Sequence, residues 1–179
     1  MTRAGRRLVA LAGVAAMLVA GVAMTGRNSE FGFWQSVGLA TGTHDDLRPA
    51  EFATLERRET PNDALVCPAE VCPRAKPDFE PPVFPVPADR LLAAARAVAL
   101  AEPRTLDLYV GADARRLRFV QRSLLLRYPD VVDVLIIPRG DGASTLAMWS
   151  RSAVGRRDFG VNRARLERWL AAIARQSTV

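Results

Sequence analysis

The sequence predicts an α+β domain: an antiparallel sheet of about four strands covered by an N-terminal and a C-terminal helix. Two segments with apolar residues at helical spacing, 90–101 and 162–175, flank a region of alternating residues from 106 to 152. Glycine, proline and aspartate divide that region into short runs. The order of a helix, four antiparallel strands and a second helix is that of an α+β layer, in which both helices are expected to cover one sheet face. A proline-rich strap and an N-terminal membrane segment are expected before this domain.

The helix and strand boundaries follow from the spacing of apolar and turn-forming residues. Asp89 can cap the first helix, 90–101. The four strands are expected at 106–110, 116–127, 131–137 and 144–152. Gly140-Asp141-Gly142 is a hairpin signal between the last two strands. The final helix, 162–175, begins at Asn162 and presents an apolar stripe to the sheet.

The segment 61–87 contains eight prolines, which favour an extended and irregular chain. We expect it to lie across the core as a strap. Its anchors are expected to be Phe79, Val83, Phe84 and Val86. Cys67 and Cys72 are the only cysteines, and in an oxidising compartment they most simply form a disulfide. A redox or metal role is the alternative, and it is disfavoured because the spacing is not Cys-x-x-Cys and the lone histidine, His44, is too little for a tetrahedral zinc site.

The N-terminal residues 1–24 have the pattern of a targeting segment. Three arginines, at 3, 6 and 7, precede an uncharged apolar run over 8–24. This run is long enough for a membrane anchor and also compatible with a cleaved signal peptide, so both remain open. In either case the positive-inside rule places the rest of the chain outside the cytoplasm. Residues 25–59 are expected to be a tether with one short helix.

The charge balance excludes one class of partner. The whole chain has a formal net charge of +6 at pH 7. Without the three N-terminal arginines, 22 basic and 19 acidic residues remain, which gives 22 − 19 = +3. This charge is too small to indicate nucleic acid as a partner. The positive charge gathers over 145–179, where seven arginines face two acidic residues.

The last third of the chain carries a motif that extends from a strand into the final helix. Its residues are Ser150, Ser152, Gly155, Asp158, Gly160, Val161, Asn162 and Arg165. Together with Pro61-Asn62 and Asp130-Val-Val-Asp133, this motif resembles the bacterial domain of unknown function 1499 family over about residues 60–175. The resemblance implies a globular domain over 60–179 that is associated with the bacterial envelope. It implies no activity, because the family has none established.

The resemblance and the N-terminal segment together predict the localisation. We expect the bacterial inner membrane, with the domain on the periplasmic side. Secretion to the periplasm is the alternative.

The closing motif has the residue types of an anion-binding site. Backbone N–H groups at a helix N-terminus attract negative charge, and arginine and serine side chains can add donors. The candidate ligand-binding residues are Ser150, Arg151, Ser152, Arg156, Asp158, Asn162, Arg163 and Arg165. A structural interpretation stays open, in which Asn162 is an ordinary N-cap and Asp158 binds turn amides or pairs with Arg165.

Catalytic signals are weak. No Gly-x-Ser-x-Gly sequence occurs, and His44 lies in the tether. Of the carboxylates, Asp130 is interpreted as a turn residue, and on a regular strand it would face away from Asp133. We therefore expect no catalytic residue, metal or cofactor. A hydrolase, the least favoured hypothesis, would need a cleft that holds Asp158 beside Ser150 or Ser152.

Two further hypotheses remain. The first is a non-catalytic module on the periplasmic side of the membrane that binds an amphipathic or anionic ligand, with its apolar part between the sheet and the final helix. The expected groove residues are Phe119, Leu125, Leu135, Met148 and Trp169. The second is a structural or assembly partner of another envelope protein, bound through the strap and the arginines.

Overall fold

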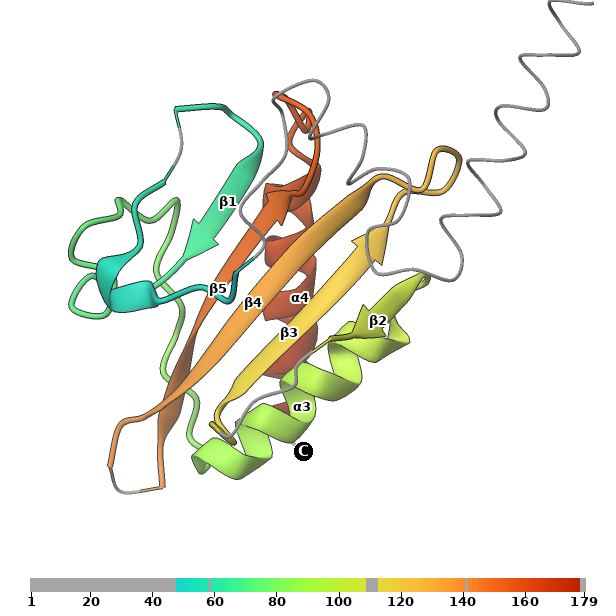
Figure 1. The fold of residues 1–179 in the computed structure, drawn as a ribbon. Helices are drawn as coiled ribbons and strands as arrows, with labels where there is room; N and C mark the ends of the chain where they lie inside the picture. The colour runs from blue at the N-terminus through green and yellow to red at the C-terminus, as the bar shows by residue number, and fades with distance from the viewer. Residues whose placement is uncertain (1–47, 58, 109–112, 141, 178–179) are drawn as a thin grey trace, which may run out of the picture.

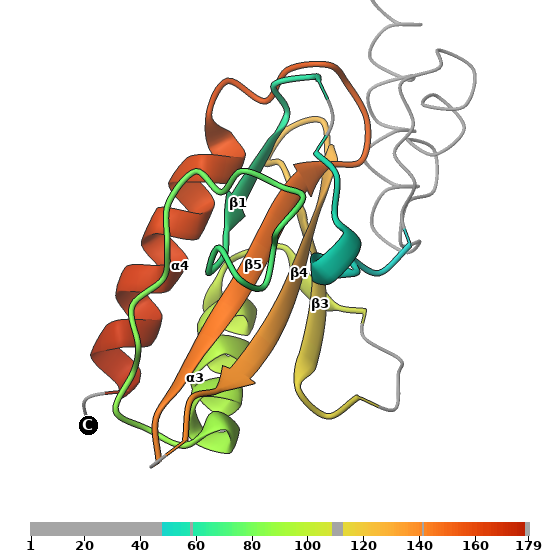
Figure 2. The same cartoon turned by 90° about the vertical axis from the view of Figure 1, so that its left-hand side faces the viewer.

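The computed structural model describes residues 48–57, 59–108, 113–140 and 142–177. Its elements are η1 (Phe52–Thr54), β1 (Asp63–Val66), α3 (Ala88–Ala101), β2 (Thr105–Asp107), β3 (Arg116–Arg122), β4 (Pro129–Pro138), β5 (Ser144–Ser152) and α4 (Val161–Ser177). The strands form one antiparallel sheet in the order β1-β5-β4-β3-β2 (Figure 1). Figure 2 shows α3 and α4 on one face of the sheet and η1 on the other. The predicted α+β class is confirmed, with five strands.

The fifth strand is β1, which lies in the segment that the prolines predict to be a strap. Between Pro61 and Pro68 lies a proline-free run that is just long enough to pair with the edge of β5. The rest of the proline-rich segment makes two isolated bridges, Val66 with Phe79 and Phe84 with Ser144. The prediction that this whole segment is an irregular strap across the core is therefore corrected, because four of its residues form a strand of the sheet.

One of the expected anchors of the strap also differs. Val83 is 60% exposed and is not an anchor, whereas Phe84 and Val86 are buried.

Three of the boundaries that differ from the predictions show how side chains and turns override the local pattern. β3 ends at Arg122, since the N–H of Ser123 donates to the carbonyl of Tyr128 and closes a loop. β4 begins at Pro129, so Asp130 is a strand residue paired with Ser152. α3 begins at Ala88, so Asp89 lies in its first turn and does not occupy the N-cap position.

The two sheet faces have separate apolar clusters. The cluster under α3 and α4 includes Phe119, Met148 and Trp169, and the rings of Phe119 and Trp169 meet edge to face with centroids 5.9 Å apart. Phe119 and Met148 are fully buried and Trp169 is 1% exposed, so these three residues do not line an open groove between the sheet and the final helix. Of the other two residues predicted for that groove, Leu125 lies in an exposed loop and Leu135 packs on the opposite face.

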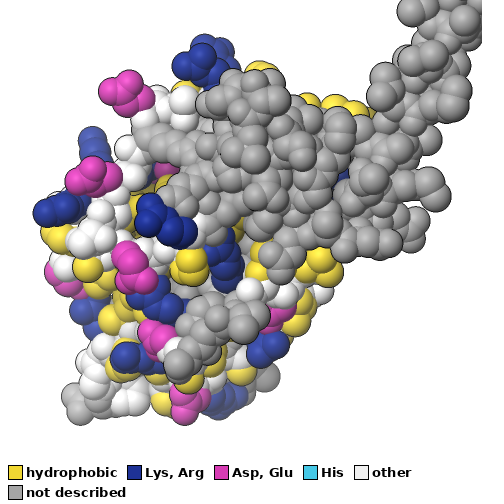
Figure 3. Space-filling view, viewed as in Figure 1, with side chains coloured by type: hydrophobic (Ala, Val, Ile, Leu, Met, Phe, Trp, Pro, Cys, Tyr) yellow, Lys and Arg dark blue, Asp and Glu magenta, His cyan; other side chains and the backbone are white. Residues whose placement is uncertain are grey.

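The cluster on the opposite face lies under η1 and contains the disulfide. Cys67 and Cys72 are bonded and buried, which confirms the predicted pairing. Trp149 and Phe52 belong to the same cluster. Where described residues are drawn in Figure 3, acidic and basic side chains lie interspersed among hydrophobic ones, in keeping with the mild net charge.

The predicted N-terminal segment, residues 1–24, lies outside the described residues, as does His44. Within the part of the chain that the structure does describe, no helix combines the length and apolarity needed to cross a bilayer.

Candidate functional site

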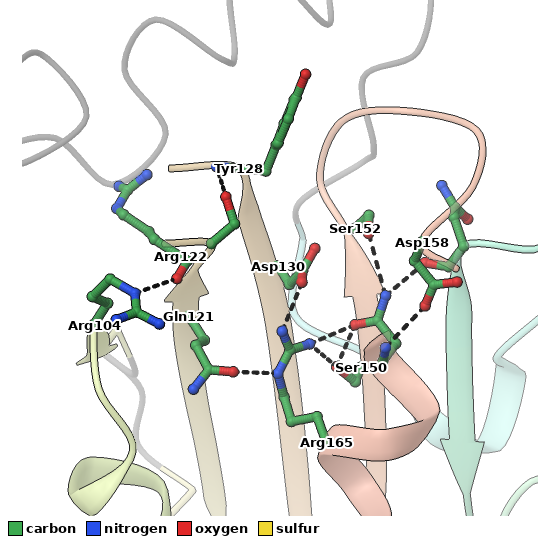
Figure 4. A network of polar contacts seen from close by, with 12 residues as sticks. Arg104, Gln121, Arg122, Tyr128, Asp130, Ser150, Ser152, Asp158 and Arg165 are labelled. Carbon is green, nitrogen blue, oxygen red and sulfur yellow. Dashed lines mark hydrogen bonds and ion pairs between the residues drawn. The ribbon is translucent and has the colours of Figure 1, made fainter. Parts of the chain in front are cut away.

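Four of the eight candidate residues meet at the end of the sheet where β5 leads into α4. Side chains alternate along a strand, so Ser150 and Ser152 both face α4. Asn162 and Arg165 are three residues apart on α4 and therefore share one side of the helix. All four residues are buried. Figure 4 shows the side chains of Ser150 and Arg165 directed toward each other.

Arg165 is the centre of this cluster. Its Nε donates to Gln121 Oε1 at 2.5 Å, and its second terminal nitrogen donates to Asp130 Oδ2 at 2.7 Å. The other terminal nitrogen donates to Ser150 Oγ at 2.8 Å and to Asn162 Oδ1 at 2.6 Å. A planar guanidinium can satisfy several acceptors in this way, whereas an ammonium group cannot reproduce the same fork. The side chain of Arg165 thus ties β3, β4 and β5 to α4.

Asn162 extends the cluster to the chain that precedes β1. Its amide nitrogen donates to the carbonyl of Asn62 at 3.0 Å and to Ser152 Oγ at 3.2 Å. The amide of Asn62 donates in turn to the carbonyl of Gly155 at 2.6 Å. Two asparagines therefore hold the start of β1 against the loop between β5 and α4.

Asp158 occupies the N-terminal end of α4. One carboxylate oxygen accepts the N–H of Gly160 at 3.1 Å, and the other accepts the N–H of Asn162 at 2.9 Å. Of the two structural roles predicted for Asp158, the structure shows the binding of turn amides. Arg165 pairs with Asp130 instead of Asp158. These two N–H groups are engaged within the chain, so the helix N-terminus does not present them to an external anion.

Three residues of this cluster were absent from the predicted site: Asn62, Gln121 and Asp130. The interpretation of Asp130 as a turn residue is wrong, because it is buried in β4 and paired with Arg165. Gln121 did carry a signal, since it is a polar residue in register with Leu117 and Phe119 on the apolar side of β3. Asn62 was noted only as part of the resemblance.

Three predicted residues lie elsewhere. Arg151 points to the opposite sheet face, where it contacts Asp133 at 2.6 Å and stacks over the ring of Trp149 at 3.9 Å. Arg163 is exposed and bonds Glu167 one helical turn further along. Arg156 is exposed in the loop between β5 and α4. The ligand-binding role of all eight residues remains a prediction.

A pocket of about 390 Å³ lies beside the buried cluster. Its apolar walls come from Tyr128 in the loop between β3 and β4, and from Val154, Phe159 and Val161 around the loop between β5 and α4. Ser152, Asp130 and Asp158 also reach its lining, and Arg157 stands at its edge. A second hollow, of about 510 Å³, shares Arg157, Asp158 and Phe159 and extends toward Arg57 and Arg163.

The residues around this pocket include exposed apolar side chains and arginines. Phe159 is 93% exposed, and its φ of 54° lies in the left-handed region, which a bulky side chain rarely adopts. Arg127 has a similar φ of 57°. Burial lowers the pKa of the Arg122 guanidinium, and repulsion from Arg127 lowers it further. Positive charge is therefore crowded at this end of the sheet.

The polar side chains of the cluster are engaged with one another. The hydroxyl of Ser150 donates to Asn162 and accepts from Arg165, so none of the described residues is positioned as a base that could activate it. Asp130 and Asp158 each accept hydrogen bonds from an arginine or from backbone amides. Among the described residues, no group of three histidine, cysteine or acidic side chains is placed to hold a metal ion. This arrangement suits rigid support of the fold.

Comparison with known proteins places the chain in a family. No curated protein matches its sequence. A family model described as "Protein of unknown function (DUF1499)" matches residues 45–173, which is most of the chain and all the elements from η1 through most of α4. The cluster around Arg165 lies within the matched region. The chain therefore belongs to the DUF1499 family.

Proposed function

We propose that the chain is a non-catalytic module of the bacterial envelope that binds an anionic, amphipathic ligand in the pocket beside the Arg165 cluster. The observation that carries this proposal is the pocket itself, which has apolar walls and an arginine at its edge. No carboxylate of the described residues pairs with Arg157. An anionic head group would meet Arg157, and an apolar portion would lie against Tyr128, Val154 and Phe159.

The hydrogen bonds that the polar side chains of the cluster make within the chain favour a binding role over a hydrolytic one. Ser152 and Asp158 do line one pocket, as the hydrolase hypothesis required. However, both carboxylate oxygens of Asp158 accept backbone N–H groups, and Ser152 Oγ accepts from Asn162. A general base must be within reach of the proton it abstracts and free to accept it. The rigid cluster instead forms a fixed floor against which a ligand can be oriented.

The predicted N-terminal segment supports the envelope location. A basic stretch followed by the apolar run 8–24 would hold the domain at the inner membrane, on its periplasmic side. Amphipathic anions are abundant at that boundary in the form of lipids and their precursors. The ligand class and the predicted location are thus consistent with each other.

Native mass spectrometry tests the proposal on the full chain after export and release in a mild detergent. We expect a co-purifying mass that is lost on denaturation. Arg157→Ala should weaken its retention about tenfold, the value of one charge-assisted contact. Arg90→Ala is the matched control, because Arg90 is an exposed arginine at the start of α3, at the opposite end of the sheet.

A clean apo mass for the unchanged chain, or equal retention by both variants, would contradict the pocket as a ligand site. If the chain instead remained bound to one envelope protein, the assembly hypothesis would replace this one.

A further inference from the structure

The two loops at the pocket expose large apolar side chains to solvent. In the loop between β3 and β4, Leu124 is 67% and Leu125 79% exposed, and Leu126 follows them. In the loop between β5 and α4, Phe159 is almost fully exposed. The two loops lie at the same end of the sheet, because the end of β3 and the end of β5 both pair with the start of β4. Exposed apolar residues gathered in this way indicate an interaction surface.

Phe159 has no local structural reason to be an aromatic residue. At a φ of 54° glycine or asparagine would be less strained, and the side chain packs into neither apolar cluster. The hairpin at the opposite end of the sheet gives the contrast. Its described residues Arg139, Gly140, Gly142 and Ala143 include no large apolar side chain, and Arg139 pairs with Glu70.

The two loops that carry the exposed apolar residues also carry positive charge. The two loops carry Arg127, Arg156 and Arg157, and no ion pair joins these three to a carboxylate of the described residues. Their one acidic residue, Asp158, has both oxygens engaged with backbone amides. Apolar side chains flanked by arginines have the composition of a surface that binds anionic lipid bilayers.

We propose that this end of the sheet docks on an anionic lipid bilayer, with Leu124, Leu125 and Phe159 entering the interface and the three arginines contacting lipid head groups. The docking loops are residues 123–128 and 153–160 together. The proposal goes beyond the proposed function, because docking requires no ligand in the pocket. A bilayer is favoured over a protein partner because leucine side chains need no shaped cavity to enter it, whereas a protein must offer one.

The chain can reach the bilayer that its own N-terminal segment would occupy. Between the apolar run, which ends at residue 24, and the first described residue, Arg48, lie 23 residues. A chain of that length can span at most about 80 Å. The carbonyl of Arg48 accepts from Arg151, two residues before the second docking loop begins. Docking in cis is therefore within the reach of the tether.

Depth measurements on the full chain test the proposal directly. The natural cysteines are bonded and buried, so an introduced cysteine is the one reactive thiol. Leu125→Cys and Phe159→Cys would each be labelled with a polarity-sensitive fluorophore and reconstituted in phosphatidylcholine vesicles, with or without phosphatidylglycerol. Val83→Cys is the matched control, an exposed apolar position at the far end of the sheet.

We expect a blue shift of the emission at positions 125 and 159 in vesicles that contain phosphatidylglycerol, quenching there by a lipid-soluble quencher, and neither effect at position 83. Replacing both Arg156 and Arg157 by glutamate should abolish the shift, whereas Arg90→Glu should leave it unchanged. Emission at 125 and 159 as water-like as at 83 would overturn docking, as would a shift that the charge reversal leaves intact.

The ligand pocket and the docking on a bilayer can be contradicted independently of each other. A co-purifying amphiphile together with water-exposed labels supports the pocket and overturns docking. Membrane-immersed labels without a co-purifying mass support docking and count against the pocket. Immersion that appears only when a particular envelope protein is added would replace the bilayer by that protein as the partner of the docking loops, and would overturn docking on lipid.

Discussion

Two buried arginines, Arg165 and Arg151, pair with carboxylates of the same strand, β4, on its opposite faces. Arg165 binds Asp130 under α4, and Arg151 binds Asp133 under η1. Around Arg165 the other partners are hydrogen-bonding side chains, whereas Arg151 stacks on the ring of Trp149. The two buried charges are thus stabilised differently: Arg165 by a network of hydrogen bonds and Arg151 by stacking on an aromatic ring.

The difference extends to the carboxylates. Among the described residues Asp130 has one cationic partner, Arg165. Asp133 has two, because Arg118 lies 3.8 Å away on the neighbouring strand. A buried charge that loses its last partner is costly, while one that keeps a second partner is less so. Loss of the buried arginine on the α4 face should therefore destabilise the fold more than loss of the one on the η1 face.

The largest effect is expected from Arg165→Ala. It leaves Asp130 buried without a counter-ion, and it should lower the free energy of unfolding by about 3–5 kcal/mol. Arg165→Lys should recover part of this loss, because an ammonium keeps the charge but not the fork. Chemical denaturation measures both. Arg168→Ala, at an exposed position on the same helix, should stay within about 0.5 kcal/mol of the unchanged chain.

Arg151→Ala should cost less, about 2–3 kcal/mol, because Arg118 remains beside Asp133. A double-mutant cycle with Trp149→Leu isolates the stacking contact, whose coupling energy should be about 1–2 kcal/mol. If Arg151→Ala proved more damaging than Arg165→Ala, the contrast drawn between the two faces would be wrong.

Removing the disulfide should affect one face only. Replacing Cys67 and Cys72 by alanine opens a short loop and should lower the free energy of unfolding by about 2 kcal/mol. Hydrogen exchange should become faster in β1 and around η1, which pack against the cystine. The amides of β3 beside Gln121 serve as the control. Faster exchange there would contradict the expectation that the disulfide stabilises only one face of the sheet.

The smallest effect is expected from Phe159→Asn. Asparagine tolerates the left-handed φ, so the free energy of unfolding should be unchanged or rise by up to about 1 kcal/mol. Thermal unfolding measures the change. A clear loss of stability would show that Phe159 supports the fold, and it would remove the argument that this side chain is held outward for a partner.

The fold could be predicted largely from local patterns. The spacing of apolar residues located both helices within about two residues at their ends, and the alternation over 144–152 gave β5 without change. The strand β1 could not be found in this way, because its four residues lie between prolines that dominate the local composition. Its existence depends on pairing with β5, which is distant in sequence.

The site was less predictable for a related reason. Strand parity placed Asp130 and Asp133 on opposite faces, as the structure confirms. Pro129, however, resembled a break, although a proline is tolerated at the first position of a strand. The pairing of Asp130 with Arg165 joins residues 35 positions apart, so no local pattern indicates it.

The hydrogen bond from Asn162 to Asn62 joins residues 100 positions apart, and this distance has a consequence for the order of folding. Until the last helix is complete, Gln121, Asp130 and Ser150 have no Arg165 to bind. Contacts between such distant residues form slowly, because a long loop must close first. In a chain truncated before Arg165, these buried polar residues would lack their partner. We therefore expect such a chain to open more readily and to be more susceptible to proteolysis.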